Sequence, residues 1–104
     1  MVSFPRQGEI WWAEVEHQRR PVLVVTRSEA VEVLTGIVVA PVTRTLRGIP
    51  TEIRLGADEG LPVDCVASFD NLQRISRSAL TTRTGDLRGR SQEICEALRA
   101  FADC

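Results

Sequence analysis

The sequence predicts a mainly β fold of the α+β class, in which five to seven short strands form a small, strongly bent barrel capped by one C-terminal helix. Two observations lead to this expectation. Short runs rich in β-branched residues recur through residues 8–84, separated by Gly, Pro and polar turns. The segment from Ser91 onward instead carries apolar residues at helical spacing. A chain of 104 residues fits one domain, so a single domain is expected over residues 1–104.

The first two predicted strands lie on either side of a polar turn at residues 16–20. Residues 8–15 alternate so that Trp11 and Trp12 face opposite sides, and both faces of this strand carry an aromatic ring. Residues 21–26 are nearly continuous in apolar and β-branched side chains, as in a strand buried on both faces. Pro21 would be the first residue of that strand, where its missing N–H is tolerated.

Later strands are shorter and more irregular in composition. Pro41 indicates an edge or a bulge in the third strand. A kink is expected at Asp70, after which extended structure resumes. The remaining strands are predicted at residues 37–43, 51–55, 63–69 and 81–84. The connecting segments are residues 27–35, ambiguous between a loop and a short irregular segment, the loops 44–50 and 56–62, and one helical turn at 76–80.

The C-terminal segment is typical of an amphipathic helix. Ser91 is a plausible N-cap, and Glu93 lies in the first turn, where a negative charge is favourable. The apolar positions that recur at helical spacing are Ile94, Ala97, Leu98 and Phe101. A barrel of this size leaves apolar surface unburied, so a homodimer is expected.

Composition argues against membrane, disulfide and metal classes. No apolar run approaches the roughly 20 residues that span a bilayer, and the first residues lack the apolar region of a secretory signal, so a cytoplasmic protein is expected. Cys65, Cys95 and Cys104 are widely spaced and odd in number, which indicates neither a disulfide framework nor a zinc site. With a single His, the chemistry is expected to need no metal and no cofactor.

The basic residues are all arginine. The net charge is −1, with 13 Arg and no Lys, and the planar guanidinium matches phosphate in two-point contacts. A GC-rich coding bias explains the composition equally well, so position is more informative. Arg44, Arg47 and Arg54 lie in or beside one loop, and Arg19 and Arg20 lie in another.

Four segments, in this order, resemble the MazF/PemK/Kid family of mRNA interferases. They are Arg6-Gln7-Gly8-Glu9-Ile10-Trp11, Arg20-Pro21-Val22-Leu23-Val24-Val25-Thr26, Val39-Ala40-Pro41-Val42-Thr43, and Val66-Ala67-Ser68-Phe69-Asp70-Asn71-Leu72-Gln73-Arg74-Ile75. The resemblance implies an SH3-like barrel that forms a dimer with an RNA-binding groove. It also implies a type II toxin that cleaves single-stranded RNA at specific sequences without a metal. In such enzymes the RNA's own 2′-hydroxyl attacks, leaving a 2′,3′-cyclic phosphate and a 5′-hydroxyl.

The resemblance assigns catalytic roles to Arg20, Thr43 and Asp70. Arg20 would stabilise the charge that develops on the scissile phosphate, because a guanidinium stays protonated at all relevant pH values. The Thr43 hydroxyl would hydrogen-bond a non-bridging oxygen. Asp70 would act as general base, although Asp followed by Asn is also ordinary turn chemistry. Two departures from the family pattern, Ser68 in place of an Arg and a short turn after the first strand, leave the proton-transfer assignment open.

A wider set of residues is expected to bind RNA. Backbone phosphates would be bound by arginines and bases by aromatic stacking or amide hydrogen bonds. Trp12 is the alternative to Trp11 as the stacking ring, and His17 is an alternative proton-transfer group. The RNA-binding candidates are His17, Arg19, Arg44, Arg47, Trp11, Asn71 and Gln73.

The implied partners are RNA and a cognate antitoxin. The substrate class would be mRNA, with tRNA and rRNA as alternatives, and a MazE-like antitoxin would lie over the groove. Two rival functions share the fold: a non-catalytic RNA- or protein-binding SH3-like module, and a CcdB-like toxin that poisons gyrase. The pair Arg20 and Thr43 distinguishes the nuclease from both.

Overall fold

The computed structural model describes residues 4–102 and consists mainly of short strands. In chain order these are β1 (Glu9–Val15), β2 (Gln18–Val24), β3 (Gly36–Thr43), β4 (Glu52–Leu55), β5 (Cys65–Ser68), β6 (Gln73–Ser76) and β7 (Leu80–Asp86). The α-helices are α1 (Ser28–Val31) and α2 (Gln92–Ala102). Four 3₁₀ turns complete the fold: η1 (Ala57–Glu59), η2 (Phe69–Asn71), η3 (Arg77–Ala79) and η4 (Arg88–Arg90).

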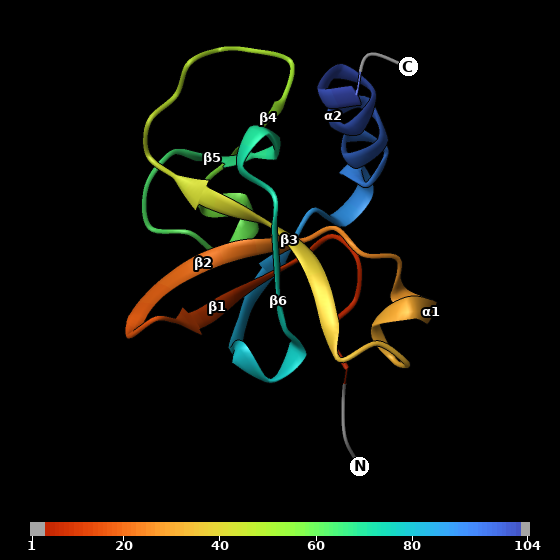
Figure 1. Cartoon of the computed structure of the whole chain (residues 1–104). Coiled ribbons are helices and arrows are strands. Elements are labelled where there is room, and N and C mark those ends of the chain that lie inside the picture. The colour runs from red at the N-terminus through yellow and green to blue at the C-terminus, as the bar shows by residue number, and fades with distance from the viewer. Residues whose placement is uncertain (1–3, 103–104) are drawn as a thin grey trace.

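The strands form one strongly curled antiparallel sheet. Its order is β4-β5-β3-β2-β1-β7, and β6 pairs with the first half of β3. Helix α2 lies at the β4 end of the molecule, where it contacts β4 and η2 (Figure 1). The predicted fold class, a small bent β-barrel with a C-terminal helix, is confirmed.

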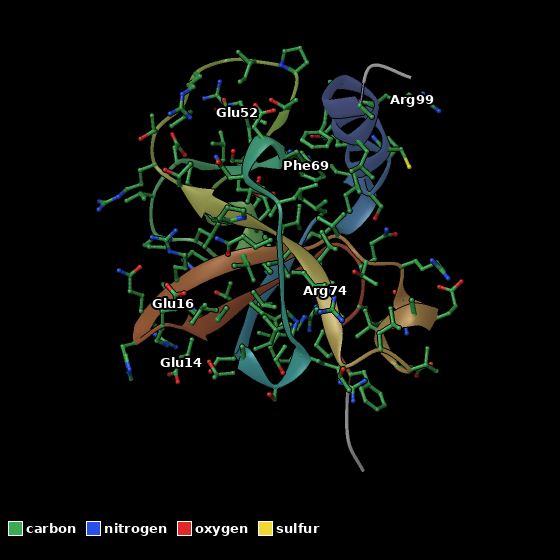
Figure 2. All side chains as sticks on the ribbon, in the orientation of Figure 1. Glu14, Glu16, Glu52, Phe69, Arg74 and Arg99 are labelled. Carbon is green, nitrogen blue, oxygen red and sulfur yellow. The ribbon has the colours of Figure 1, made fainter. Side chains whose placement is uncertain are left out.

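Two apolar clusters form the core, one on each face of the central strands. Strand β2 contributes to both, because Leu23 belongs to the first cluster and Val22 and Val24 to the second. The predicted double-sided burial of this strand is therefore confirmed. Phe69, labelled in Figure 2, is fully buried and joins the first cluster together with Ile94 of α2.

Strand β2 starts earlier than the sequence predicts. The turn between β1 and β2 consists of Glu16 and His17 alone, which have φ angles of 52° and 65°. Positive φ at both central residues is typical of the tight hairpin turn whose twist matches the flanking strands. The prediction of a turn over residues 16–20 is thus wrong, because the hairpin needs only two residues. Arg19, Arg20 and Pro21 lie within β2, and the acidic side chains of Glu14 and Glu16 mark the hairpin tip in Figure 2.

Pro41 lies where one edge of β3 changes partner. On that edge β6 pairs with residues 36–39, and β5 pairs with residues 42–43. On the opposite edge Pro41 is paired with Val22 of β2. Pro41 is therefore neither on an outer strand nor in a bulge. Its missing N–H is tolerated because it falls in the gap between two partners.

Several other boundaries differ from the predictions. The ambiguous segment 27–35 contains the short helix α1, and the predicted strand 63–69 shortens to β5. The predicted strand 81–84 lengthens to β7 because it pairs along most of β1. Ser91 has helical dihedrals, φ −60° and ψ −26°, since η4 runs directly into α2, so it lacks the extended backbone of an N-cap. Within residues 4–102 no helix is long and apolar enough to cross a membrane.

Candidate active site

The candidate site lies where strands β2 and β3 stop pairing. Their ladder joins Val24 to Val39, Leu23 to Ala40 and Val22 to Pro41, and it ends there. The residue of β2 that precedes Val22 is Pro21. The carbonyl of Val24 accepts from Gly8 on the β1 side, so by strand alternation the backbone of Pro21 faces β3. Proline has no N–H to donate at that position, so a further pair with β3 would lack one of its two hydrogen bonds.

The two main catalytic candidates lie just beyond the last pair of this ladder. Arg20 is two residues before Val22 in β2, and Thr43 is two residues after Pro41 in β3. A continued register would set Pro21 opposite Val42 and Arg20 opposite Thr43. All four of these residues line one pocket. The structure thus brings together, from separate strands, a guanidinium and a hydroxyl.

The pocket has a volume of about 430 Å³, which lies within the range of small-molecule sites. The basic and hydroxyl-bearing residues of its lining are Arg20, Thr43 and Arg44. The rest of the lining is apolar or weakly polar and consists of Trp12, Pro21, Val42, Leu61, Pro62, Val63 and Cys65. None of these lining residues is Asp, Glu or His, so its side chains include no carboxylate or imidazole.

Arg20 and Thr43 are both available to a ligand. Arg20 is exposed, and it forms no ion pair with a carboxylate among residues 4–102. The Thr43 hydroxyl oxygen accepts a hydrogen bond from the backbone N–H of Thr45 at 3.2 Å. That contact uses a lone pair and leaves the hydroxyl proton free to be donated.

Asp70 lies outside this pocket. Its carboxylate Oδ2 accepts a hydrogen bond from the Thr51 hydroxyl at 2.6 Å, in the turn η2. Ser68, which stands where the resembling family carries an Arg, is buried and accepts from Asn71 Nδ2 at 3.0 Å. The structure therefore separates Asp70 and Asn71 from the pocket formed by Arg20 and Thr43.

The remaining RNA-binding candidates are distributed around the pocket. Arg44 lines it, and Gln73 lines a smaller adjoining pocket of about 70 Å³ that also contains Arg20. His17 is at the exposed hairpin tip. The backbone N–H of Arg47 donates to Glu52 Oε1 at 3.0 Å, and the Arg47 guanidinium lies 4.0 Å from the same carboxylate.

Of the two tryptophans, the structure places Trp12 in the pocket. Its ring lies beneath the Arg19 guanidinium, with 4.5 Å between the guanidinium carbon and the ring centroid. Trp11 points to the other face, where it packs against the second core cluster and donates its indole N–H to Glu9 at 3.0 Å. The β1 alternation shows that the two rings diverge, but only the β1–β2 register, which pairs Trp12 with Pro21, shows which ring reaches the pocket.

The apolar wall at residues 61–63 is a feature that sequence reasoning missed. It belongs to the loop after η1, which is held from two sides. The Thr84 hydroxyl donates to the Gly60 carbonyl at 2.8 Å, and Arg90 contacts the buried Glu59 carboxylate at 3.0 Å. These contacts link the wall to β7 and to the start of α2. No local signal in the sequence indicates them.

The cysteines do not suggest catalysis. Cys65 lines the pocket but is buried, and burial raises the pKa of its thiol, with Asp64 and Glu59 adding to the effect. A raised pKa keeps the sulfur protonated and weakly nucleophilic. Cys95 is exposed on α2, and Cys104 lies outside the described residues. Among residues 4–102 no group of three or more His, Cys, Asp or Glu side chains could hold a metal ion.

Comparison with known proteins identifies a consistent set of relatives. Residues 6–102 match the family model for the PemK-like, MazF-like toxin of type II toxin-antitoxin systems. A probable endoribonuclease MazF2 of Mycobacterium tuberculosis is 41% identical over 101 residues, covering 95% of this chain and 99% of the relative. A probable endoribonuclease MazF5 of the same organism is 38% identical over 108 residues, covering 100% and 98%.

Solved structures show the same fold. The Mycobacterium tuberculosis toxin MazF-mt6 superposes with a TM-score of 0.84 at 35% identity, covering 91% of this chain and 96% of that one. A mycobacterial endoribonuclease in complex with its cognate antitoxin superposes with a TM-score of 0.82 at 22% identity, covering 95% of both chains. At that identity the second likeness speaks for the fold alone.

Proposed function

The chain belongs to the PemK-like, MazF-like toxin family of type II toxin-antitoxin systems and is an endoribonuclease, and we propose that it cuts single-stranded RNA in the pocket between Arg20 and Thr43. The observation that supports this location is that Arg20 and Thr43, each two residues beyond the last β2–β3 pair, line the same pocket. Neither a binding module nor a gyrase poison needs such a pair.

The proposed reaction uses the RNA as its own nucleophile. The 2′-hydroxyl oxygen forms a bond to the adjacent phosphorus, and the bond from phosphorus to the 5′-oxygen breaks. The products are a 2′,3′-cyclic phosphate and a 5′-hydroxyl. DNA lacks the attacking hydroxyl and is not cut. The enzyme contributes mainly positioning and electrostatic stabilisation of the phosphorane-like transition state.

Arg20 and Thr43 act on the non-bridging phosphate oxygens. The guanidinium donates two N–H groups to the developing negative charge, and the Thr43 hydroxyl donates a third hydrogen bond. Both groups sit on strands, which hold them more rigidly than loops would. No carboxylate or imidazole lines the pocket, so in this proposal solvent accepts the 2′-hydroxyl proton and also supplies the proton that the leaving 5′-oxygen takes up. Asp70, hydrogen-bonded to Thr51, is assigned no direct proton transfer.

The partners follow from the family. The chain binds a cognate antitoxin that neutralises it; a mycobacterial endoribonuclease has been solved in complex with its cognate antitoxin, and MazE–MazF structures are known from Deinococcus radiodurans. A homodimer would cover apolar side chains that one chain leaves exposed; the large ones outside the pocket are Val33, Leu34, Leu46, Ile49 and Phe101. We place the protein in the cytoplasm, where RNA and antitoxin are encountered.

A cleavage assay tests the proposal. Purified protein free of antitoxin is incubated with single-stranded RNA in EDTA, and the ends of the products are identified. Wild type is expected to leave cyclic phosphate and 5′-hydroxyl ends. Arg20→Ala and Thr43→Val should each lower kcat by about 10²- to 10³-fold, the usual loss for one oxyanion-stabilising donor. Arg99→Ala, an exposed arginine on α2, is the matched control and should leave the rate unchanged. Cleavage by Arg20→Ala at the wild-type rate would refute the assignment.

A further inference from the structure

The candidate active site is larger than a phosphate needs, and its lining combines two kinds of side chain. Arg20, Thr43 and Arg44 suit a phosphate. Trp12 and the wall at residues 61–63 are aromatic or apolar. A nucleotide combines the same two chemistries, a charged phosphate and a flat, weakly polar base. The apolar part of the lining therefore requires an explanation beyond phosphate binding.

Trp12 has the properties of a binding platform. The side chain is only partly buried and belongs to neither of the two core clusters, unlike Trp11 on the opposite face. It is held in place from two sides: Pro21 lies opposite it in the β1–β2 register, and the Arg19 guanidinium stacks over its ring. Arg19 occupies one side of the ring, and the part of the side chain that lines the pocket is not used by the core and is available to a ligand.

The opposite wall of the pocket is apolar and anchored. Leu61 is buried, whereas Val63 is 45% exposed at the mouth of the pocket. The Glu59–Arg90 ion pair and the Thr84–Gly60 hydrogen bond hold the loop just before this wall. An aromatic ring and a fixed apolar surface thus line the same pocket, and aromatic and apolar side chains bind unpaired bases in single-stranded nucleic acids.

We propose that Trp12 and the wall at residues 61–63 form a stacking site for the base of a nucleotide that adjoins the scissile phosphate. This inference rests on the proposed function. The lining of the pocket contains no amide or carboxylate side chain to read the edge of a base, and its two guanidiniums are the groups that suit the phosphate. Stacking is sequence-tolerant because every base has a flat face. The site therefore supplies affinity and orientation, and the cleavage sequence is degenerate at this nucleotide.

The first test is a double-mutant cycle, in which the Trp12 side chain and the base are removed separately and then together. The substrate is a short RNA centred on a cleavage site mapped for the wild-type protein, with an abasic nucleotide placed on either side of the scissile phosphate. For one of the two positions, the abasic change and Trp12→Leu should each lower kcat/KM by about 5- to 150-fold. Together they should cost little more than either alone. Fully additive losses at both positions would overturn the proposal.

Control variants and substrates distinguish a loss of base stacking from misfolding of the protein and from recognition of a particular base. Trp12→Phe keeps an aromatic face and should recover a large part of the loss, while Trp11→Phe should leave the abasic penalty unchanged. With the intact base, A, C, G and U at the coupled position should differ by less than about tenfold in kcat/KM. A strong preference for one base would contradict the proposed degeneracy.

A binding measurement tests base stacking on Trp12 even if the protein does not cleave the RNA. Trp11→Phe leaves Trp12 as the single tryptophan. Its fluorescence should be quenched by the same RNA made uncleavable with a 2′-deoxy nucleotide at the attacking position, and not by the matching abasic RNA. Equal quenching by both RNAs, or by neither, would refute base stacking. Absence of cleavage together with base-dependent quenching would instead count against the nuclease assignment alone.

Discussion

Replacing Arg90 with methionine should destabilise the fold by about 3 kcal/mol, because this guanidinium joins three separate elements. It contacts Glu59 Oε2 at 3.0 Å, Glu93 at 2.7 and 3.0 Å, and the Arg54 carbonyl at 2.7 Å. The hydrogen bonds to Glu93 raise the pKa of Arg90 further above its ordinary value, so its charge is permanent. Its loss leaves the Glu59 carboxylate, 8% exposed, without a counter-charge.

The magnitude follows from two opposing effects. Removing one partner of a buried ion pair costs about 3 to 5 kcal/mol, because the remaining charge is desolvated. Here the Arg90 side chain is 34% exposed, so water can partly replace it, and Glu59 keeps its hydrogen bond from the Gly56 N–H at 2.7 Å. The lower end of the range, about 3 kcal/mol, is therefore expected.

Thermal unfolding checks this prediction. For a domain of this size 1 kcal/mol corresponds to a change in Tm of about 4 °C or more, so Arg90→Met should melt roughly 12 °C below wild type. Arg99→Met, the same exchange at an exposed position of α2, should melt within about 2 °C of wild type. Both variants are compared at equal protein concentration, since a dimer's Tm depends on it. Equal Tm values for the two variants would show that the Arg90 contacts do not hold the loop.

Three further outcomes follow from the loop and from α2. Gly60→Ala should lower the free energy of unfolding by more than the roughly 1 to 2 kcal/mol that a left-handed residue costs, because its Cβ would overlap a backbone carbonyl of β7. Gly48 has φ +68° and no neighbour within 4 Å, so Gly48→Ala should show the backbone cost alone in the same denaturant titration. Hydrogen bonding to Arg90 lowers the pKa of Glu93 below its ordinary value of 4.5. The decrease in Tm caused by Glu93→Gln, relative to wild type, should therefore be full at pH 7 and should become smaller as the pH falls through the lowered pKa. A decrease in Tm that does not change with pH would exclude this linkage. In iodoacetamide at pH 8, peptide mapping should find Cys95 alkylated well before Cys65, whose pKa is raised by burial, and faster labelling of Cys65 would mean that the pocket wall opens.

Much of the fold is visible in the sequence because alternation and β-branching are local. The double-sided burial of β2, the strand β1 and the helix α2 follow from side-chain periodicity alone. The ends of strands are harder to predict from the sequence when they depend on pairing with another strand. The sequence places the start of a strand at Pro21, whereas the two-residue turn after Val15 lets β2 begin at Gln18.

The candidate site is predictable only in part, for the same reason. Family resemblance selects Arg20 and Thr43, but only the pairing of Val22 with Pro41 explains why residues so distant in sequence meet. The resemblance also selects Asp70, which the structure holds against Thr51 outside the pocket. The wall at residues 61–63 depends on a long-range contact between Glu59 and Arg90, and no periodicity in the chain encodes such a contact.

Pro21 stands where the β2–β3 ladder ends and the pocket begins. An imino nitrogen cannot donate, so a pair between Pro21 and Val42 would lack one of its two hydrogen bonds. We expect a residue with an N–H at this position to favour one further pair of the ladder and so to narrow the pocket beside it. The identity of a residue with no reactive group therefore bears on the space available at the proposed RNA site.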